Sequence, residues 1–541
     1  MQKILPKTRD GRAVANRQTS ISRRRLLQGA GATALLSGAG AVGAIRPEAA
    51  AAQPQPAYRL EVYKEVVDVP GVKLRTYNGL VPGPTLRVDP GQDLDVILVN
   101  ELEPEPPEAF CPPVQNQFHA ANTTNLHTHG LHVSPHKSAD GQYDSDNIFL
   151  SVTPKNQQAP GSGHCLDDNL RRGSTWYNFQ IPADHYPGTF WYHAHRHGST
   201  ARQVGGGLSG PLIVNDPPGH MPGYIAGAKE DIFLIQLRDL TEDAPSPSQN
   251  IGDLTMVLAR PEGGGFKSPT MLMRPGEVRR WRFINAAPRS DAFVSLSQPE
   301  DSPIKPEIYQ IAFDGITLER RVRVDLTDRG DPWDDHASMA PGNRTDFMIR
   351  IPRDAPEGET QLVALQAPVE RLHAVAEPTA DPVVMSIKIA GDPVDDEWSD
   401  SDDLPGPGPL LRPIAPEEIV EERAFLFNLD FGSGKPTRYT INDREFDGEV
   451  RDFFKLGTAE RWYIRNRNDF THPFHIHVNP FFVTHIRGKE LAADDPRRRW
   501  QDTIALPTAI LDGDSNVVEL GEVTALSRFV RFTGKFVIHC H

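Results

Sequence analysis

Histidines spaced two residues apart are the feature of this chain best suited to chemistry. Side chains alternate between the two faces of a β-strand, so residues i and i+2 point the same way. Each such pair can therefore aim two imidazoles at one metal ion. Four pairs supply eight histidines, enough to hold several ions. The pairs are His127 with His129, His193 with His195, His475 with His477, and His539 with His541.

The last pair encloses a cysteine, Cys540. On a strand this side chain points away from its two histidine neighbours. His472 stands in the same relation to His475, because the two lie three positions apart, which is an odd number. His472 and Cys540 can thus meet at one metal site while the paired histidines meet at another. A thiolate with imidazoles suits copper, and the few covalent bonds joining the two sites favour electron transfer.

Two other readings of the histidine pairs compete with copper. A single pair is usually an ordinary polar pair on an edge strand, but four pairs in one chain argue against that reading. A zinc site is the second alternative, and it would use closely spaced cysteines or His-x3-His sets. The chain has only three cysteines, too few to complete either kind of zinc set. The sequence therefore predicts a copper protein.

The stretches around these residues resemble the multicopper oxidases, and in particular their three-domain laccase-like group. The stretches are HTHGLHVSP, GTFWYHAHRHGSTARQVGGGLSGPLIV, HPFHIHVNPFFV and FTGKFVIHCH. Weaker matches lie between them, among them QIAFDGITL, APGNRTDF and RWQDTIALP. The resemblance runs from about Tyr58 to the last residue.

The resemblance implies four coppers and a role for each ligand. Type-1 copper would oxidise phenolic or aromatic-amine donors one electron at a time, and a trinuclear cluster would reduce O2 to water. His472 and Cys540 would bind type-1 copper, and His127 and His475 type-2 copper. The paired type-3 coppers would be held by His129, His193, His195, His477, His539 and His541.

The family pattern continues beyond His541, with a second type-1 histidine and an axial ligand. We therefore expect this sequence to lack its C-terminal end; a natural truncation with an impaired type-1 site is the alternative. An acid after the first pair delivers protons in the family. Asp140, Asp144 and Asp146 are the candidates here, and SDNIF favours Asp146. A surface carboxylate in a polar loop is the competing interpretation.

The elements that position these residues are expected to be short strands. The chain has 541 residues, 44 glycines and 49 prolines, which suits about three domains rich in turns. The device "turn glycine, then apolar strand" occurs three times, in VDPGQDLDVILVN, MRPGEVRRWRFIN and FKLGTAERWYIRN. We expect an all-β fold of three cupredoxin-like Greek-key β-sandwiches, at 55–216, 225–391 and 416–541. The middle unit has no metal motif and is expected to be a spacer, and the acidic, Pro-rich linker 392–415 is not expected to pack into a core.

The first 52 residues look like an export signal. Residues 22–28, SRRRLLQ, precede a weakly apolar run and resemble a twin-arginine signal, with small residues for cleavage at 49–52. A basic arm or a membrane anchor is the alternative. Export predicts a periplasmic or secreted protein without stable membrane insertion, and partners in the twin-arginine machinery. It would also allow Cys111 and Cys165 to form a disulfide.

Charge narrows the function further. The segment 1–52 carries nine basic and two acidic residues, so the remainder has a net charge of −22. Such an acidic body argues against nucleic acid as a partner and leaves O2 and a small reducing substrate. A periplasmic Cu(I) oxidase in copper tolerance is a second reading, although the chain has only 8 Met. A copper-free scaffold of the same fold is a third.

Overall fold

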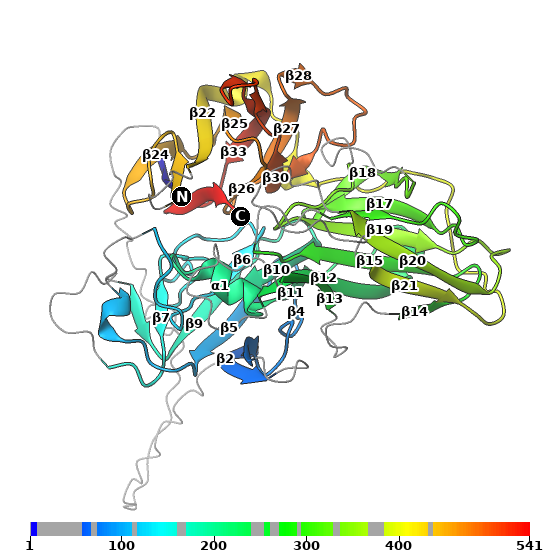
Figure 1. The fold of residues 1–541 in the computed structure, drawn as a ribbon, viewed down its shortest axis with the longest axis horizontal. Helices are drawn as coiled ribbons and strands as arrows, with labels where there is room; N and C mark the ends of the chain where they lie inside the picture. Colours follow the sequence, from blue (N-terminus) through cyan, green and yellow to red (C-terminus); the bar gives the residue numbers. More distant parts are fainter. Residues whose placement is uncertain are drawn as a thin grey trace, which may run out of the picture.

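The computed structural model describes residues 2–7, 57–66, 73–110, 116–158, 169–239, 254–259, 270–288, 294–327, 336–365, 383–430 and 437–541. Within these ranges the regular secondary structure is almost entirely β-strand, and the two α-helices are short: α1 (Thr200–Gly205) and α2 (Gly223–Ala226). Figure 1 shows three strand-rich parts, coloured blue to cyan, green, and yellow to red. The C-terminus lies between the first and third parts. The all-β prediction is confirmed.

The first part is a sandwich of two four-stranded sheets, in the orders β3-β2-β5-β9 and β4-β11-β10-β6. A small parallel pair, β7 with β8, lies beside them. The core of this first sandwich includes Leu98, Phe179 and Leu212, all fully buried. The elements are β2 (Tyr58–Val66), β3 (Lys73–Tyr77), β4 (Leu86–Val88), β5 (Asp93–Asn100), η1 (Pro107–Phe110), β6 (His127–His129), β7 (Ser151–Thr153), β8 (Leu170–Arg172), β9 (Ser174–Gln180), β10 (Gly188–His193) and β11 (Ser209–Val214).

The middle part pairs a six-stranded sheet, β13-β12-β15-β19-β17-β18, with a four-stranded sheet, β14-β21-β20-β16. Trp281, Phe283 and Phe347 lie in its core. The strands are β12 (Lys229–Asp239), β13 (Leu254–Ala259), β14 (Thr270–Met273), β15 (Val278–Asn285), β16 (Ser295–Ser297), β17 (Glu307–Phe313), β18 (Ile316–Arg323), β19 (Arg344–Arg350), β20 (Gly358–Leu365) and β21 (Val383–Ile389).

The third part combines the sheet β24-β1-β34-β26-β30 with the sheet β23-β22-β25-β33-β27-β28, to which β29 adds, and a hairpin β31-β32. Strand β1 comes from the segment assigned above to an export signal. The elements are β1 (Gln2–Lys7), η2 (Pro409–Leu411), η3 (Pro416–Glu418), β22 (Ile419–Asp430), β23 (Arg438–Ile441), β24 (Val450–Lys455), β25 (Thr458–Asn466), β26 (His472–Ile476), β27 (Phe481–Ile486), β28 (Lys489–Glu490), β29 (Trp500–Gln501), β30 (Thr503–Leu506), β31 (Ile510–Leu511), β32 (Val517–Glu519), β33 (Gly521–Phe529) and β34 (Phe536–Cys540).

The same three-strand unit recurs in each sandwich. Its central strand, β5, β15 or β25, pairs in parallel with β2, β12 or β22. On its other side it pairs antiparallel with β9, β19 or β33. The glycine that precedes each central strand, Gly91, Gly276 or Gly457, has a φ of 84°, 82° or 84°. A turn in this left-handed region favours glycine, which explains why the repeated sequence device contains one.

A buried asparagine ends each central strand in the same way. Asn100, Asn285 and Asn466 are all fully buried. In each, the side-chain oxygen accepts a hydrogen bond from the backbone N–H two residues later, and the side-chain nitrogen donates to backbone carbonyls of a neighbouring segment. The repeat predicted from sequence therefore extends to single hydrogen bonds.

The acidic linker does pack, contrary to expectation. Trp398 and Leu404 lie against a buried cluster of the middle sandwich that includes Met348. The guanidinium of Arg321 lies 4.6 Å from the ring centroid of Trp398, and its Nε donates to Asp402. Most aspartates of the segment remain exposed, whereas its two apolar residues pack against the buried cluster.

Two predictions concern residues outside the described ranges. Cys111 and Cys165 both fall there, so their pairing stays a prediction. Most of segment 1–52, assigned to the export signal, also falls there. The domain boundaries likewise stay predictions. No helix in the described ranges is long and apolar enough to cross a membrane.

Candidate metal centre

Paired strands bring the histidine pairs together. In the first sandwich His193 of β10 lies opposite His127 of β6. In the third, His475 of β26 lies opposite His539 of β34. Only the pair on β6 lies wholly within a strand, because β10, β26 and β34 end before His195, His477 and His541. The two rings of each pair nevertheless stay 5.2–5.8 Å apart between centroids.

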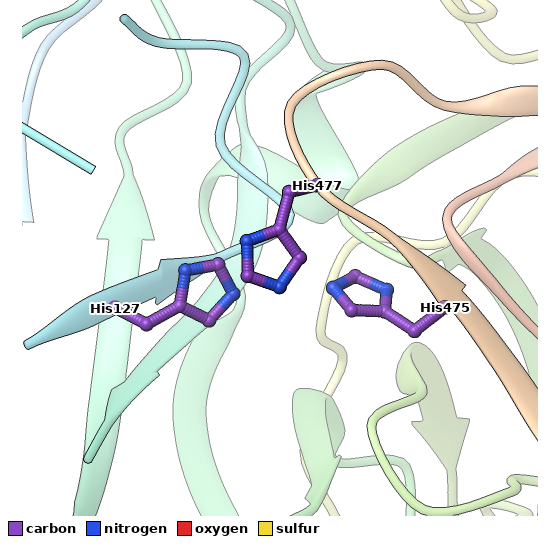
Figure 2. Close-up of side chains that lie close together, drawn as sticks. All are labelled: His127, His475 and His477. Atoms are coloured by element: carbon purple, nitrogen blue, oxygen red, sulfur yellow. The ribbon is translucent and has the colours of Figure 1, made fainter. Parts of the chain in front are cut away.

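Imidazoles of the first and third sandwiches interleave at the junction. The ring of His127 stacks on that of His477 at 3.9 Å, and the ring of His129 stacks on that of His475 at 3.8 Å. Figure 2 shows His127 approaching His475 and His477 from the opposite side of the junction. Seven of the eight imidazoles are at most 8% exposed, and His541 is half-buried. The eight histidines thus form one cluster built from two distant parts of the chain.

Nitrogen atoms within this cluster lie at metal-binding distances from one another. Three all-histidine groups each have one nitrogen per residue within 4.8 Å of the others. A fourth group joins two of the histidines to Asp502. The all-histidine groups are His127 with His475 and His477, His127 with His129 and His193, and His195 with His477 and His539.

The hydrogen bonds of the imidazoles fit a metal in the cluster. The Nδ1 atoms of His127, His193 and His475 bond to Asp146 and to backbone carbonyls, while their buried Nε2 atoms have no hydrogen-bond partner. The Nε2 atoms of His195 and His539 face each other at 3.2 Å. Nδ1 of His539 bonds to the Cys540 carbonyl, so its Nε2 presents a lone pair. Unpartnered lone pairs that converge in a buried space suit a cation.

Burial also keeps these rings neutral. It lowers the pKa of His195 to about 3 and those of His127 and His539 well below the ordinary value, with neighbouring imidazoles adding to the effect. A neutral imidazole is the form that binds a metal. Imidazole donors favour copper, zinc, iron or nickel over magnesium or calcium.

Of the three candidate acids, Asp146 is the one that reaches the cluster. Its two carboxylate oxygens lie 2.9 and 3.0 Å from Nδ1 of His127, and it accepts a hydrogen bond from the backbone N–H of Thr128. Burial raises its pKa to about 7, against the bonds from Thr128. Asp144 instead pairs with Arg171, and Asp140 is exposed. The structure therefore places Asp146 where the sequence argument put it.

The second predicted site also assembles. Nδ1 of His472 lies 3.4 Å from Sγ of Cys540, as the strand parity predicts. Nε2 of His472 lies 2.8 Å from the side-chain oxygen of Asn468, which therefore accepts the ring proton and leaves the Nδ1 lone pair facing the sulfur. Burial raises the pKa of the Cys540 thiol to about 12. A positive ion beside the sulfur would be needed to hold the thiolate form.

Sequence reasoning missed two neighbours of the cluster, Asp502 and Thr503. Nδ1 of His475 lies 2.9 Å from the carbonyl oxygen of Asp502 and 2.9 Å from Oγ1 of Thr503. Both residues belong to the stretch RWQDTIALP, which was noted only as a weak match. The polar Asp-Thr pair before an apolar strand was the available signal.

Three β-sandwiches with a buried histidine cluster between the first and third define a class of metalloprotein. Profiles described as multicopper oxidase match residues 113–219 and 423–541, the segments that carry all ten predicted ligands. The chain belongs to the multicopper oxidase family, in its three-domain laccase-like group, and is an oxidoreductase that uses copper.

Relatives match across most of the chain. A laccase of Bacillus subtilis is 25% identical over 88% of this chain and 88% of its own length. A multicopper oxidase of Staphylococcus aureus is 23% identical over 86% of this chain and 80% of its own length.

Solved structures agree on the fold. A multicopper oxidase from Campylobacter jejuni, described as a metallo-oxidase, covers 90% of this chain and 88% of its own, with a TM-score of 0.61 and 22% identity. A laccase from Pediococcus acidilactici covers 90% of this chain and 86% of its own, with a TM-score of 0.61 and 21% identity. The cupredoxin-like prediction is thereby confirmed.

Proposed function

We propose that this protein is a laccase-like oxidase that takes single electrons from phenolic or aromatic-amine donors and reduces O2 to water. One observation carries the proposal: eight imidazoles converge between the first and third sandwiches, and the segment His539-Cys540-His541 joins that cluster to a second site at His472. A donor site linked by covalent bonds to a buried acceptor site is what a multi-electron oxidase requires.

The ligand roles follow the family resemblance. His472 and Cys540 would hold type-1 copper, and His127 and His475 type-2 copper. Copper bound at the two sites would accept electrons singly and pass four of them to O2. The type-3 pair would be held by His129, His193, His195, His477, His539 and His541.

The residues around the ligands would orient them and handle protons. Asp146 accepts the Nδ1 proton of His127, which fixes the ring with its Nε2 atom toward the cluster. The same carboxylate lies 3.9 Å from Nδ1 of His477, so it contacts imidazoles of both sandwiches. We assign to Asp146 the delivery of protons to the reducing site. The near-complete burial of the imidazoles would exclude bulk water from the site.

Copper loading of the full chain tests the proposal. After copper is added and excess removed, elemental analysis should find at least three coppers per chain. Oxygen uptake with a methoxyphenol should then exceed that of the metal-free chain. Zinc in place of copper, or no bound metal, would overturn the proposal. Copper without donor-dependent oxygen uptake would overturn the assigned reaction.

An oxidase of cuprous ions is the second candidate, and the methionines argue against it. Six of the eight, Met221, Met271, Met273, Met339, Met348 and Met385, are at most 5% exposed and lie in packed clusters. None of these six can present its sulfur to a Cu(I) ion at the surface. A higher kcat/KM for Cu(I) than for phenols would reverse this preference.

Export by the twin-arginine route is part of the proposal, which places the protein in the periplasm or outside the cell. The motif SRRRLLQ at 22–28 supports it. Replacing both Arg23 and Arg24 by lysine should leave the protein in the cytoplasm of a host with an intact export system. Unchanged export of that variant would contradict the route.

A further inference from the structure

The middle sandwich touches the histidine cluster although it contributes no histidine to it. A Cβ added to Gly342 would lie 3.0 Å from Cε1 of His129 and 3.3 Å from Cδ2 of His541. Gly342 has a φ of 94°, so the turn that begins β19 presses its backbone against imidazoles of both outer sandwiches.

One guanidinium, that of Arg344, joins all three sandwiches. It is fully buried. Its Nε donates to the carbonyl of Thr189 on β10 at 3.2 Å, and its Nη1 donates to the carbonyl of Gly342 at 3.0 Å. Its two terminal nitrogens donate to the two carboxylate oxygens of Asp502 at 2.8 and 2.6 Å. Such a two-pronged pair fixes the carboxylate in direction as well as in position.

Asp314, in the turn after β17, holds the same segment by its backbone. One carboxylate oxygen accepts hydrogen bonds from the backbone N–H groups of Asp502 and Thr503, both at 3.0 Å. The side chain of Asn343 donates to the carbonyl of Thr503 at 2.9 Å. Residues 502 and 503 of the third sandwich are therefore held on side chain and backbone by the middle sandwich.

Those two residues in turn contact the imidazoles. Oγ1 of Thr503 lies 2.9 Å from Nδ1 of His475 and 3.2 Å from Nε2 of His129. The Asp502 carbonyl oxygen lies 2.9 Å from Nδ1 of His475, while its carboxylate lies 3.4 Å from the His129 ring nitrogen. Asp502 also belongs to a group with metal-binding spacing, but both its oxygens are bound to Arg344, which favours a supporting role over that of a ligand.

We infer that Arg344 and Asp314 are positioning residues of the metal centre: through Asp502 and Thr503 they fix the ring orientation of His475 and His129. The inference rests on the proposed copper site. The middle sandwich is then more than a spacer, because it sets which nitrogen of His475 carries the proton and which faces the cluster. Groups that orient metal-binding imidazoles typically contribute ten- to hundredfold to metal affinity.

The test compares two buried arginines of the middle sandwich. Arg344→Lys removes the two-pronged contact with Asp502. Arg282→Lys is the matched control, because Arg282 is similarly buried and also bonds to the side chain of Thr189. Its other partners, Glu230, Asp346 and Asp216, lie outside the cluster. Both variants should lower the unfolding midpoint of the metal-free chain. Arg344→Lys alone should weaken copper retention ten- to hundredfold and change the electron paramagnetic resonance signal of type-2 copper.

The positioning role of Arg344 and the proposed oxidase function can fail separately. If the wild-type chain loads copper and Arg344→Lys matches Arg282→Lys in copper affinity and resonance signal, the inference is wrong and the proposed function stands. If the wild-type chain takes up no copper, both fall.

A second variant covers the case in which Arg344→Lys does not fold. Thr503→Val removes one hydroxyl and keeps the side-chain shape, with Thr345→Val, a fully buried threonine on β19, as its control. Thr503→Val should change the resonance signal and the copper affinity, and Thr345→Val should change neither. A wild-type signal and affinity in Thr503→Val would overturn the inference.

Discussion

The outer two sandwiches and the middle one share a framework but use it differently. All three have the same central strand, the same turn glycine and the same buried asparagine at the end of that strand. In the outer two, the segments that follow lead to His127 and to His472. In the middle one, Gly342 and Arg344, at the start of β19, contact the cluster or its neighbours instead. The repeated strands thus supply the same backbone in all three sandwiches. The side chains placed on it determine whether a sandwich contributes metal-binding histidines or only positions them.

The junctions between sandwiches differ as well. The first and third meet through stacked imidazoles. The first and middle meet through ions: Arg280 of β15 binds Asp216, and Glu230 of β12 bridges Arg282 of β15 to Arg87 of β4. One junction is therefore suited to a metal and the other is sealed by charge.

The largest expected effect comes from a substitution that should disable the site at His472 and Cys540 but leave the histidine cluster intact. Cys540→Ser should reduce donor oxidation below detection, because the thiolate joins the donor site to the cluster. The cluster histidines keep their positions, so the copper they hold should remain. Oxygen uptake, visible absorption and elemental analysis measure the three quantities. Turnover retained in this variant would show that electrons reach the cluster by another path.

The ionic junction should fail in acid. Burial works to raise the pKa of Glu230, but Arg282 and Arg87 outweigh it and lower that pKa to about 2, from an ordinary value of 4.5. A lowered carboxyl pKa stabilises the fold above pH 4.5, and this contribution is lost as the pH falls from 4.5 to 2. Glu230→Gln should therefore cost about 3 kcal/mol of unfolding free energy at pH 7 and almost nothing at pH 2.

Thermal unfolding across that pH range measures this loss. Asp447→Asn removes an exposed carboxylate that pairs with Arg451, and it serves as the control. Exposed pairs are screened by solvent, so this variant should shift the midpoint little at any pH. A constant difference between Glu230→Gln and the wild type from pH 7 to pH 2 would contradict the assignment.

The repeated asparagines test whether the shared strand framework controls the predicted metal site at His472. Asn285→Ala and Asn466→Ala should each destabilise the fold by about 1–3 kcal/mol, because buried backbone groups lose their partners. Only Asn466→Ala should also shift the absorption of a copper at His472, since Asn466 holds the backbone of Asn468, which binds the His472 ring. Equal absorption shifts in both variants would show that the middle frame also controls this site.

The smallest effect concerns the turn glycines. Gly457→Ala should cost about 1–2 kcal/mol, because an alanine there must adopt a left-handed conformation and a Cβ meets nothing within 4 Å. Gly276→Ala should cost more, because its Cβ would lie 2.0 Å from the Val394 carbonyl oxygen in the linker. Denaturant unfolding of both variants gives the comparison. Equal losses of unfolding free energy would mean that the linker backbone at Val394 shifts to accommodate the added methyl group at little cost.

Local patterns predicted much of the frame and the cluster. Strand parity alone placed His472 beside Cys540, and the turn glycines located the central strands, because both depend on residues close in sequence. Asp146 was chosen because SDNIF resembles the family segment, and its role in proton delivery stays a prediction. The ten ligand roles stay predictions, although the structure brings the side chains together.

Contacts between distant segments could not be predicted. Arg344 and Asp502 are 158 residues apart, and nothing in either stretch reveals the other. The linker was misjudged for the same reason: its aspartates are mostly exposed, but Trp398 and Leu404 pack against residues of the middle sandwich that are distant in sequence. Strand β1 shows the limit again, since its partners β24 and β34 lie at the far end of the chain.

Because imidazoles of two sandwiches interleave, the metal concentration should determine how cooperatively the chain unfolds. His127 stacks on His477 and His129 on His475, and two of the all-histidine groups combine residues of both sandwiches. An ion held by such a group binds the docked pair more tightly than either sandwich alone. By mass action, an ion at a thousand times its dissociation constant would add about 4 kcal/mol to the docked state. The first and third sandwiches would then unfold as one unit at high metal concentration and as separate units at low concentration. The surrounding metal concentration would thus set the order in which the sandwiches unfold.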